Sequence, residues 1–171
     1  MSEESRPLWA PWRIDFIRSK KEPGCFLCGN ESRDEARNEE ELIIARLPLC
    51  FVILNRYPYN SGHLMVAPYR HVGDLAGLEP EESHAIMDAC VMTKEVLAGL
   101  LKPDGFNIGF NLGLAAGAGV ADHIHMHIVP RWNGDTNFMP VMSGSRVVPE
   151  ALVETARLIR AAWPENSGAN L

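Results

Sequence analysis

Polar and apolar residues alternate strictly from His123 to Ile128, in a segment that ends at Pro130. Strict alternation in a segment rich in β-branched residues predicts a strand that is buried on one face. Because every second side chain of a strand points the same way, His123, His125 and His127 are predicted to share one face. The residues between them are predicted to belong to the core: Ile124, Met126 and Ile128.

The rest of the hydrophobic pattern predicts four more strands and two helices. The strands are expected at residues 41–46, 50–55, 64–67 and 106–111. A proline and acidic residues at 78–82 indicate the start of a long helix that ends before Pro103. A second helix, with one apolar stripe, is predicted from about Pro149 to Trp163. This order of elements predicts an α+β fold with a largely antiparallel sheet, since strands and helices do not alternate strictly.

Composition places the chain among ordinary globular proteins. Its 171 residues are 46% hydrophobic and 22% charged, and the pattern contains no repeat and no interdomain linker. We therefore expect a single domain over residues 1–171, with an aromatic-rich N-terminal arm at 1–20 and a disordered tail at 164–171. The arm either packs on the core or closes over a site or a neighbouring subunit.

Charge and hydropathy limit the partners and the compartment. No apolar run approaches the ~20 residues of a membrane span, and the polar start lacks the apolar core of a signal peptide, so a cytoplasmic location and no membrane partner are expected. The net charge of −6 argues against a nucleic-acid-binding surface. Disulfides are not expected among the four cysteines of such a chain.

Three histidines on one face of a strand indicate chemistry more strongly than a lone histidine would. A His-x-His pair can hold a metal such as zinc with a third ligand from elsewhere. Alternatively, a neutral imidazole can attack an electrophile, provided that a fixed acceptor such as a backbone carbonyl holds its tautomer. The segment Asn111–Gly119 is a loop of small residues leading toward the strand. Such loops expose backbone N–H groups to anions, which favours phosphate chemistry.

Cys25-Phe-Leu-Cys28 is compatible with either a metal knuckle or a redox pair. Redox pairs of the thioredoxin type follow a strand, and no strand is predicted before Cys25. Zinc would need two more nitrogen or sulfur ligands, and His71 and His123 are available. The other two cysteines, Cys50 and Cys90, lie in apolar patterns and are predicted to be inert core residues.

The segment His123–Val129 resembles the His-φ-His-φ-His-φ-φ signature of the histidine triad family of nucleotide hydrolases and transferases. Asn55–Pro68 is similar to the family's segment from an asparagine to a Gly-His pair. Asn111 and Gly117–Gly119 fall where the family has an asparagine and a phosphate loop.

The resemblance extends to roughly residues 8–163. Leu8–Arg13 and Pro130–Phe138 look like the bacterial branch that includes diadenosine tetraphosphate phosphorylases. The segment after the triad is either an acceptor-phosphate site, with Arg131, Asn133, Thr136 and Asn137 in reach, or a structural turn.

The resemblance implies a role for each site residue. His125 would attack the α-phosphorus of an adenylylated polyphosphate, and water or phosphate would then attack the nucleotidyl-histidine. His63 would lie behind the triad and order it, and Asn55 would reach the ribose. The remaining substrate contacts would come from Asn111, His127 and the backbone N–H groups of Gly117, Ala118 and Gly119.

The resemblance also implies a Cys, Cys, His, His metal set that matches Cys25, Cys28, His71 and His123. His123 could serve phosphate or zinc, and the cysteine pair favours zinc. Four protein ligands would make this zinc structural, and no organic cofactor is expected. The family also implies a homodimer with a sheet extended between subunits, or a higher oligomer.

Two other hypotheses remain open at the sequence level. The first is a zinc-dependent phosphohydrolase with His123 and His125 as catalytic ligands. The second is a non-catalytic nucleotide-binding or scaffolding module. The sequence departs from the eukaryotic family pattern because Gly117–Val120 carries no polar side chain before the triad, which leaves the preferred dinucleotide open.

Overall fold

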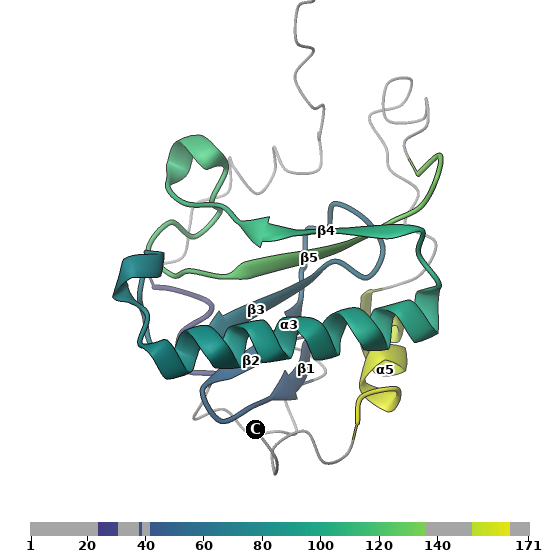
Figure 1. The fold of residues 1–171 in the computed structure, drawn as a ribbon, viewed down its shortest axis with the longest axis horizontal. Helices are drawn as coiled ribbons and strands as arrows, with labels where there is room; N and C mark the ends of the chain where they lie inside the picture. The colour runs from purple at the N-terminus through teal and green to yellow at the C-terminus, as the bar shows by residue number, and fades with distance from the viewer. Residues whose placement is uncertain (1–23, 31–37, 39–41, 136–151, 165–171) are drawn as a thin grey trace, which may run out of the picture.

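The computed structural model describes residues 24–30, 38, 42–135 and 152–164 (Figure 1). Within them, five strands form one antiparallel sheet in the order β1-β2-β3-β5-β4. The strands are β1 (Ile43–Arg46), β2 (Cys50–Leu54), β3 (Leu64–Pro68), β4 (Gly105–Phe110) and β5 (Met126–Arg131). The α-helices are α3 (Pro80–Leu101) and α5 (Leu152–Ala161), and the short 3₁₀ helices are η2 (Leu75–Gly77) and η3 (Leu114–Ala116).

Helix α3 begins and ends where local signals place its ends. Pro80 occupies the first turn, and the side chain of Glu82 accepts the backbone N–H of Glu79 in a capping box. The helix ends at Leu101 and is followed by the C-cap residue Lys102, which adopts a left-handed conformation just before Pro103. These signals are local, which is why the sequence predicted this helix closely.

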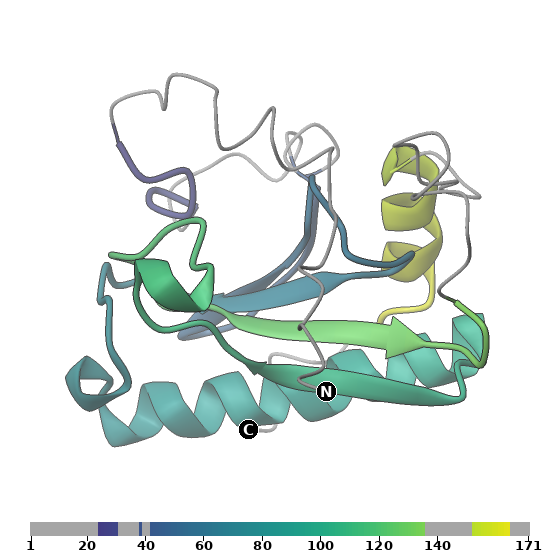
Figure 2. The ribbon, with the colours of Figure 1, turned by 90° about the horizontal axis from the view of Figure 1, so that it is seen from above.

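One face of α3 packs along the sheet, where it contacts β2, β3 and β5 (Figure 2). The contacting stripe is buried and includes Ile86, Ala89, Cys90, Thr93 and Leu97. Strands β2 and β3 are buried along their whole length, as expected for the centre of the core. Helix α5 lies beside β1 and buries Thr155, Ala156 and Ile159 (Figure 1).

The predicted α+β fold with an antiparallel sheet, one long helix and a C-terminal helix is confirmed. Strand and helix positions agree to within a few residues of the described chain. The predictions for the N-terminal arm, for the start of the last helix and for most of the tail lie outside the described residues. No helix among the described residues is long and apolar enough to cross a membrane.

The predicted strand through all three histidines is wrong at its start, because β5 begins only at Met126. The ladder with β3 stops at the pair Val66–Met126. Further on, β3 ends at Pro68, which has no N–H to offer a neighbouring strand. Ile124 donates its N–H to the carbonyl of Val72 in the following loop instead. The predicted core positions Ile124, Met126 and Ile128 are nevertheless buried.

Cys50 and Cys90 are buried in the core, as predicted. Burial raises the pKa of both thiols, and that of Cys50 reaches about 12. Neither thiol therefore forms a reactive thiolate at neutral pH.

We predict that Gly62→Ala destabilises the protein while Gly99→Ala does not. Gly62 has a φ of +72°, and an added Cβ would lie 2.6 Å from Cδ1 of Leu101. The left-handed conformation and the crowding together should cost about 1–3 kcal/mol. Gly99 is inside α3 with open space around it, so alanine there should stabilise by about 0.5–1 kcal/mol. Urea unfolding of both variants measures the difference, and equal stabilities would refute the assignment of the Gly62 turn.

Candidate active site and metal centre

The backbone fixes the tautomer of His125. Its Nδ1 lies 2.9 Å from the carbonyl oxygen of His123. A carbonyl only accepts hydrogen bonds, so Nδ1 carries the proton and Nε2 keeps its lone pair. Burial lowers the pKa of His125, with a smaller opposing contribution from the bond to the His123 carbonyl. The ring is therefore a neutral imidazole with Nε2 as its nucleophilic atom.

Two more histidines lie close to His125: His127 is next to it, and His63 is next to His127. The rings of His125 and His127 meet edge-on, with centroids 4.8 Å apart. Nδ1 of His127 lies 2.9 Å from Nε2 of His63, and Nδ1 of His63 lies 3.0 Å from the backbone nitrogen of Tyr59. The structure thus places His63 directly behind the triad.

The N–H of Tyr59 determines where the protons of this pair lie. A backbone N–H can only donate, so Nδ1 of His63 accepts and Nε2 of His63 carries the proton. That proton is donated to Nδ1 of His127, which leaves the proton of neutral His127 on Nε2. His127 therefore presents an N–H donor on a ring whose centroid lies 4.8 Å from that of His125.

Two asparagines contact these histidines: Asn55 lies beside His63, and Asn111 lies beside His127. Oδ1 of Asn55 accepts the N–H of Tyr57 at 2.8 Å, so Nδ2 of Asn55 faces the ring of His63. The amide nitrogen Nδ2 of Asn111 lies 3.3 Å from Nε2 of His127. Since that nitrogen is protonated, the amide oxygen is its natural partner, and a half-turn of the amide brings the oxygen there. Contacts of Asn55 and Asn111 with a nucleotide remain predictions.

The small-residue loop folds onto itself around η3. The N–H of Gly117 donates to the Leu114 carbonyl at 3.0 Å, and that of Ala118 to the Gly113 carbonyl at 3.4 Å. In this structure, two of the three backbone donors predicted for phosphate are thus used inside the loop. The phosphate role of Gly117–Gly119 remains a prediction.

Four predicted ligands come together at a separate centre. The ligand atoms of Cys25, Cys28, His71 and His123 all lie within 4.8 Å of one another. Nδ1 of His71 is 3.1 Å from the sulfur of Cys28, and Nδ1 of His123 is 3.4 and 3.5 Å from the sulfurs of Cys25 and Cys28. Tetrahedral zinc with these ligand types separates its donor atoms by about 3.3–3.8 Å. The spacing of the group therefore fits such an ion.

The protonation of this group also fits a metal. Nε2 of His123 lies 2.9 Å from the carbonyl oxygen of Pro68 and donates to it, so the lone pair on Nδ1 faces the two sulfurs. Burial lowers the pKa of His123, which keeps the ring neutral. The pKa of the Cys28 thiol is raised by burial and by its contact with Cys25. A bound cation would favour the thiolate form of Cys28.

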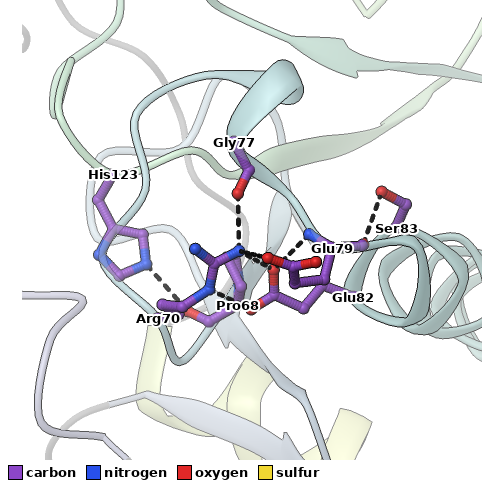
Figure 3. Close-up of polar contacts among 7 residues, drawn as sticks. All are labelled: Pro68, Arg70, Gly77, Glu79, Glu82, Ser83 and His123. Atoms are coloured by element: carbon purple, nitrogen blue, oxygen red, sulfur yellow. Dashed lines mark hydrogen bonds and ion pairs between the residues drawn. The ribbon is translucent and has the colours of Figure 1, made fainter.

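The segment that carries His71 is fastened to helix α3 (Figure 3). Arg70 donates to both carboxylate oxygens of Glu82, at 3.0 and 2.5 Å, and to the carbonyl of Gly77 at 2.7 Å. The hydrogen bond from Arg70 lowers the pKa of Glu82, whose carboxylate also accepts the N–H of Glu79. The exposed His71 thus follows a residue locked by a bidentate ion pair.

The geometry does not favour a catalytic metal on His123 and His125. Nδ1 of His123 faces the cysteines, and its Nε2 is bound to a carbonyl. His125 is not part of the metal-compatible group found among the described residues. The structure therefore separates the Cys/His group that could hold a metal from the pair of His125 and His127.

Arg131 is engaged at the end of β5. Its Nε and Nη2 donate to Asp135 at 2.6 and 2.8 Å, and its Nη1 donates to Asn107 at 2.7 Å. The backbone N–H of Asn133 donates to Asp104. Thr136 and Asn137 lie outside the described residues. An acceptor-phosphate site in this segment remains a prediction.

Sequence reasoning missed three residues around His63. Tyr59 stacks on the His63 ring with centroids 4.9 Å apart and planes 16° apart. Asn60 donates to Asp135 at 2.8 Å. Tyr59 and Asn60 lie within Asn55–Pro68, which the sequence identified only as similar to a family segment, and an aromatic residue among turn-forming residues was the available signal. Asp135 offered no sequence signal, because its partners are 4 and 75 residues away.

Comparison with known proteins gives one family. The HIT domain model matches residues 36–134. The chain is 39% identical over 167 residues to a Mycobacterium tuberculosis protein named AP-4-A phosphorylase, covering 94% of this chain and 86% of that protein. It is also 31% identical over 93 residues to the Schizosaccharomyces pombe bis(5'-nucleosyl)-tetraphosphatase (asymmetrical), covering 54% of this chain and 50% of that protein.

The fold is similar to that of solved HIT proteins. A Zn-bound histidine triad family protein from Mycobacterium smegmatis aligns with a TM-score of 0.58 and 31% identity, covering 71% of this chain and 83% of that chain. A Plasmodium falciparum diadenosine triphosphate hydrolase aligns with a TM-score of 0.59 and 22% identity, covering 71% of this chain and 76% of that chain, a likeness of fold alone.

Proposed function

The chain belongs to the HIT domain family, and from this premise we propose that it cleaves the α-phosphate anhydride of diadenosine tetraphosphate and related dinucleotides. The observation that carries the proposal is the pairing of His125 and His127. The first presents the lone pair of a neutral imidazole, and the second presents an N–H donor beside it. The similarity to AP-4-A phosphorylase over most of the chain supports the substrate class.

The reaction has two steps. Nε2 of His125 attacks the α-phosphorus, and the bond to the leaving polyphosphate oxygen breaks as the N–P bond forms. The N–H of His127 donates to that oxygen as negative charge develops on it. The polyphosphate then leaves as an anion. The nucleotidyl group stays bonded to Nε2 of His125, whose ring is now a cation that keeps its proton on Nδ1 and donates it in a hydrogen bond to the His123 carbonyl.

In the second step an acceptor attacks the same phosphorus and the N–P bond breaks. Phosphate dianion attacks directly and gives a nucleoside diphosphate. Water gives the monophosphate and releases its proton to solvent. Neutral His125 is regenerated in both cases.

We propose that the group of Cys25, Cys28, His71 and His123 holds a structural zinc. The spacing of the four side chains, the tautomer of His123 and the similarity to a Zn-bound family member support this. A zinc with four protein ligands supplies no catalytic chemistry, because no position is left for water. Its effect would be to fasten the segment before β5, and so the approach to His125, to the rest of the fold.

The proposal includes a homodimer whose sheet continues through β4. This strand is the last of the sheet among the described residues, and the centre of β4, including Ile108, is exposed. An exposed edge of this kind is a template for pairing with another copy. The net charge of −6 supports a small-molecule substrate over a nucleic-acid partner.

We predict that diadenosine tetraphosphate is cleaved by phosphorolysis at least as well as by hydrolysis. Phosphate held beside the nucleotidyl-histidine can outcompete abundant water, since effective molarities of well-oriented groups reach ~10⁵ M or more. Product analysis with labelled phosphate measures this, with labelled ADP appearing alongside ATP. AMP and ATP in amounts unchanged by added phosphate would mean a plain hydrolase. Cleavage of no dinucleotide, despite AMP binding, would mean a non-catalytic nucleotide-binding module.

A further inference from the structure

Asn60 ties the turn before His63 to the far end of β5. Its Nδ2 donates to Asp135 at 2.8 Å and to the carbonyl of Pro130 at 3.1 Å. These two acceptors lie 70 and 75 residues further along the chain. The side chain of Asn60 is therefore a long-range link between two loops.

Asp135 is a rigid partner for this link. Besides the Asn60 amide, it accepts two hydrogen bonds from Arg131 and one from the backbone N–H of Trp132. The hydrogen bonds from Arg131 hold the pKa of Asp135 far below its usual range. The carboxylate is buried apart from about a tenth of its side-chain surface, so its position is well defined.

The backbone of the same turn reaches His63. The carbonyl of Asn60 accepts the N–H of His63 at 3.1 Å, and the N–H of Tyr59 donates to the His63 ring at 3.0 Å. The ring of Tyr59 also stacks on that of His63. Moving Asn60 would thus move the N–H group that sets the His63 tautomer.

Asn55 cannot replace this N–H. Its Nδ2 lies 3.3 Å from Nδ1 and 3.5 Å from Nε2 of His63. Because the two distances are nearly equal, the amide favours neither ring nitrogen strongly. Of these two donors to His63, the backbone N–H of Tyr59 is therefore the one that distinguishes its ring nitrogens.

We infer that Asn60, held by Asp135, is a positioning residue that keeps the protons of His63 and His127 on Nε2 and so aims an N–H at the leaving group. The link acts through the turn and touches no reacting atom. The inference deepens the proposed function and rests on it for the kinetic consequence, whereas the tautomer itself can be observed without any reaction.

The first readout is the tautomer state in the unliganded full-length protein. Long-range proton–nitrogen NMR correlations distinguish a ring protonated on Nδ1 from one protonated on Nε2. Wild type should show Nε2–H for both His63 and His127. Asn60→Ala should show a mixture of tautomers for both rings.

The second readout is sensitivity to the leaving group, measured with aryl esters of AMP from phenol to nitrophenols. Nitrophenolate is a good leaving group and needs no hydrogen-bond donor on its oxygen. Phenolate, with a conjugate-acid pKa near 10, leaves slowly unless an N–H donates to its oxygen. A general acid contributes ~10²–10⁴-fold, so we expect Asn60→Ala to lower kcat by about tenfold or more for the phenyl ester. The loss for the nitrophenyl ester should be about threefold or less.

Two further variants sharpen the test. Asn107→Ala truncates an asparagine of the same network that contacts Arg131 but not the turn, and should leave tautomers and leaving-group sensitivity as in wild type. Asp135→Asn preserves the shape of the link without its charge and should lie between wild type and Asn60→Ala. It supplies the comparison if Asn60→Ala does not fold.

The outcomes separate this inference from the proposed function. Wild-type tautomers and unchanged leaving-group sensitivity in both Asn60→Ala and Asp135→Asn would overturn the inference. An equal loss with every ester, without a tautomer change, would show a merely structural role and also overturn it. If wild type cleaves no AMP ester but the tautomers shift in Asn60→Ala, the proposed function fails and the positioning role stands.

Discussion

His125→Asn should lose turnover by about 10³-fold or more, equivalent to ~4 kcal/mol of barrier, while it still binds AMP. An amide can occupy the space of the imidazole but cannot form the covalent nucleotidyl intermediate. The reaction would then depend on direct attack by water, without the nucleophile that splits it into two easier steps. Steady-state kinetics with diadenosine tetraphosphate and calorimetric titration with AMP measure the two quantities separately.

The matched control is His84→Asn. His84 lies on the exposed side of α3, so the same substitution there should change neither turnover nor AMP binding. If His125→Asn keeps more than about a tenth of wild-type turnover, a barrier change below ~1.4 kcal/mol, the nucleophile is misassigned.

Cys25→Ser/Cys28→Ser should lose zinc and a large part of the protein's stability. Purified wild type should contain about one zinc per chain, since four ligand atoms of suitable type lie within 4.8 Å of one another. Because a preformed site exists only in the folded state, the free energy of metal binding adds to that of folding. Metal analysis and thermal unfolding, with and without chelator, measure both effects.

A matched pair of histidine variants tests the fourth ligand. His71 and His84 are both exposed, but only His71 belongs to the metal group. His71→Ala should weaken zinc retention against a chelator by about 100-fold or more, since loss of an outer-shell partner alone costs 10–100-fold. His84→Ala should retain zinc like wild type. Absence of zinc from wild-type protein prepared without chelator would refute the metal assignment.

The elements that could be predicted from the sequence are those specified by local signals. Helix α3 has Pro80 in its first turn, a capping box and Pro103 after its end. The strands are short apolar runs between turn residues, and the alternating pattern identified Met126 and Ile128 as core. The family motif indicated which histidines and cysteines to examine, and the structure brings them together in two groups.

The parts that could not be predicted depend on contacts between distant segments. The start of β5 is set by where the ladder with β3 ends, near Pro68. The direction of the His123 ring depends on a carbonyl 55 residues away. Asn60 and Asp135 meet only because the turn folds onto the end of β5. Periodicity and local motifs carry no information on such pairings.

The central claim is that the nucleotidyl group is first bonded covalently to His125 through its α-phosphorus and is then transferred to the acceptor. The configuration of a chiral α-phosphorothioate analogue of diadenosine tetraphosphate, hydrolysed in heavy-oxygen water, tests it most directly. Each of two successive in-line displacements, first by Nε2 of His125 and then by water, inverts the configuration at phosphorus. The two inversions together retain the original configuration. We predict net retention. Net inversion would mean a single direct attack by water and would contradict the covalent mechanism.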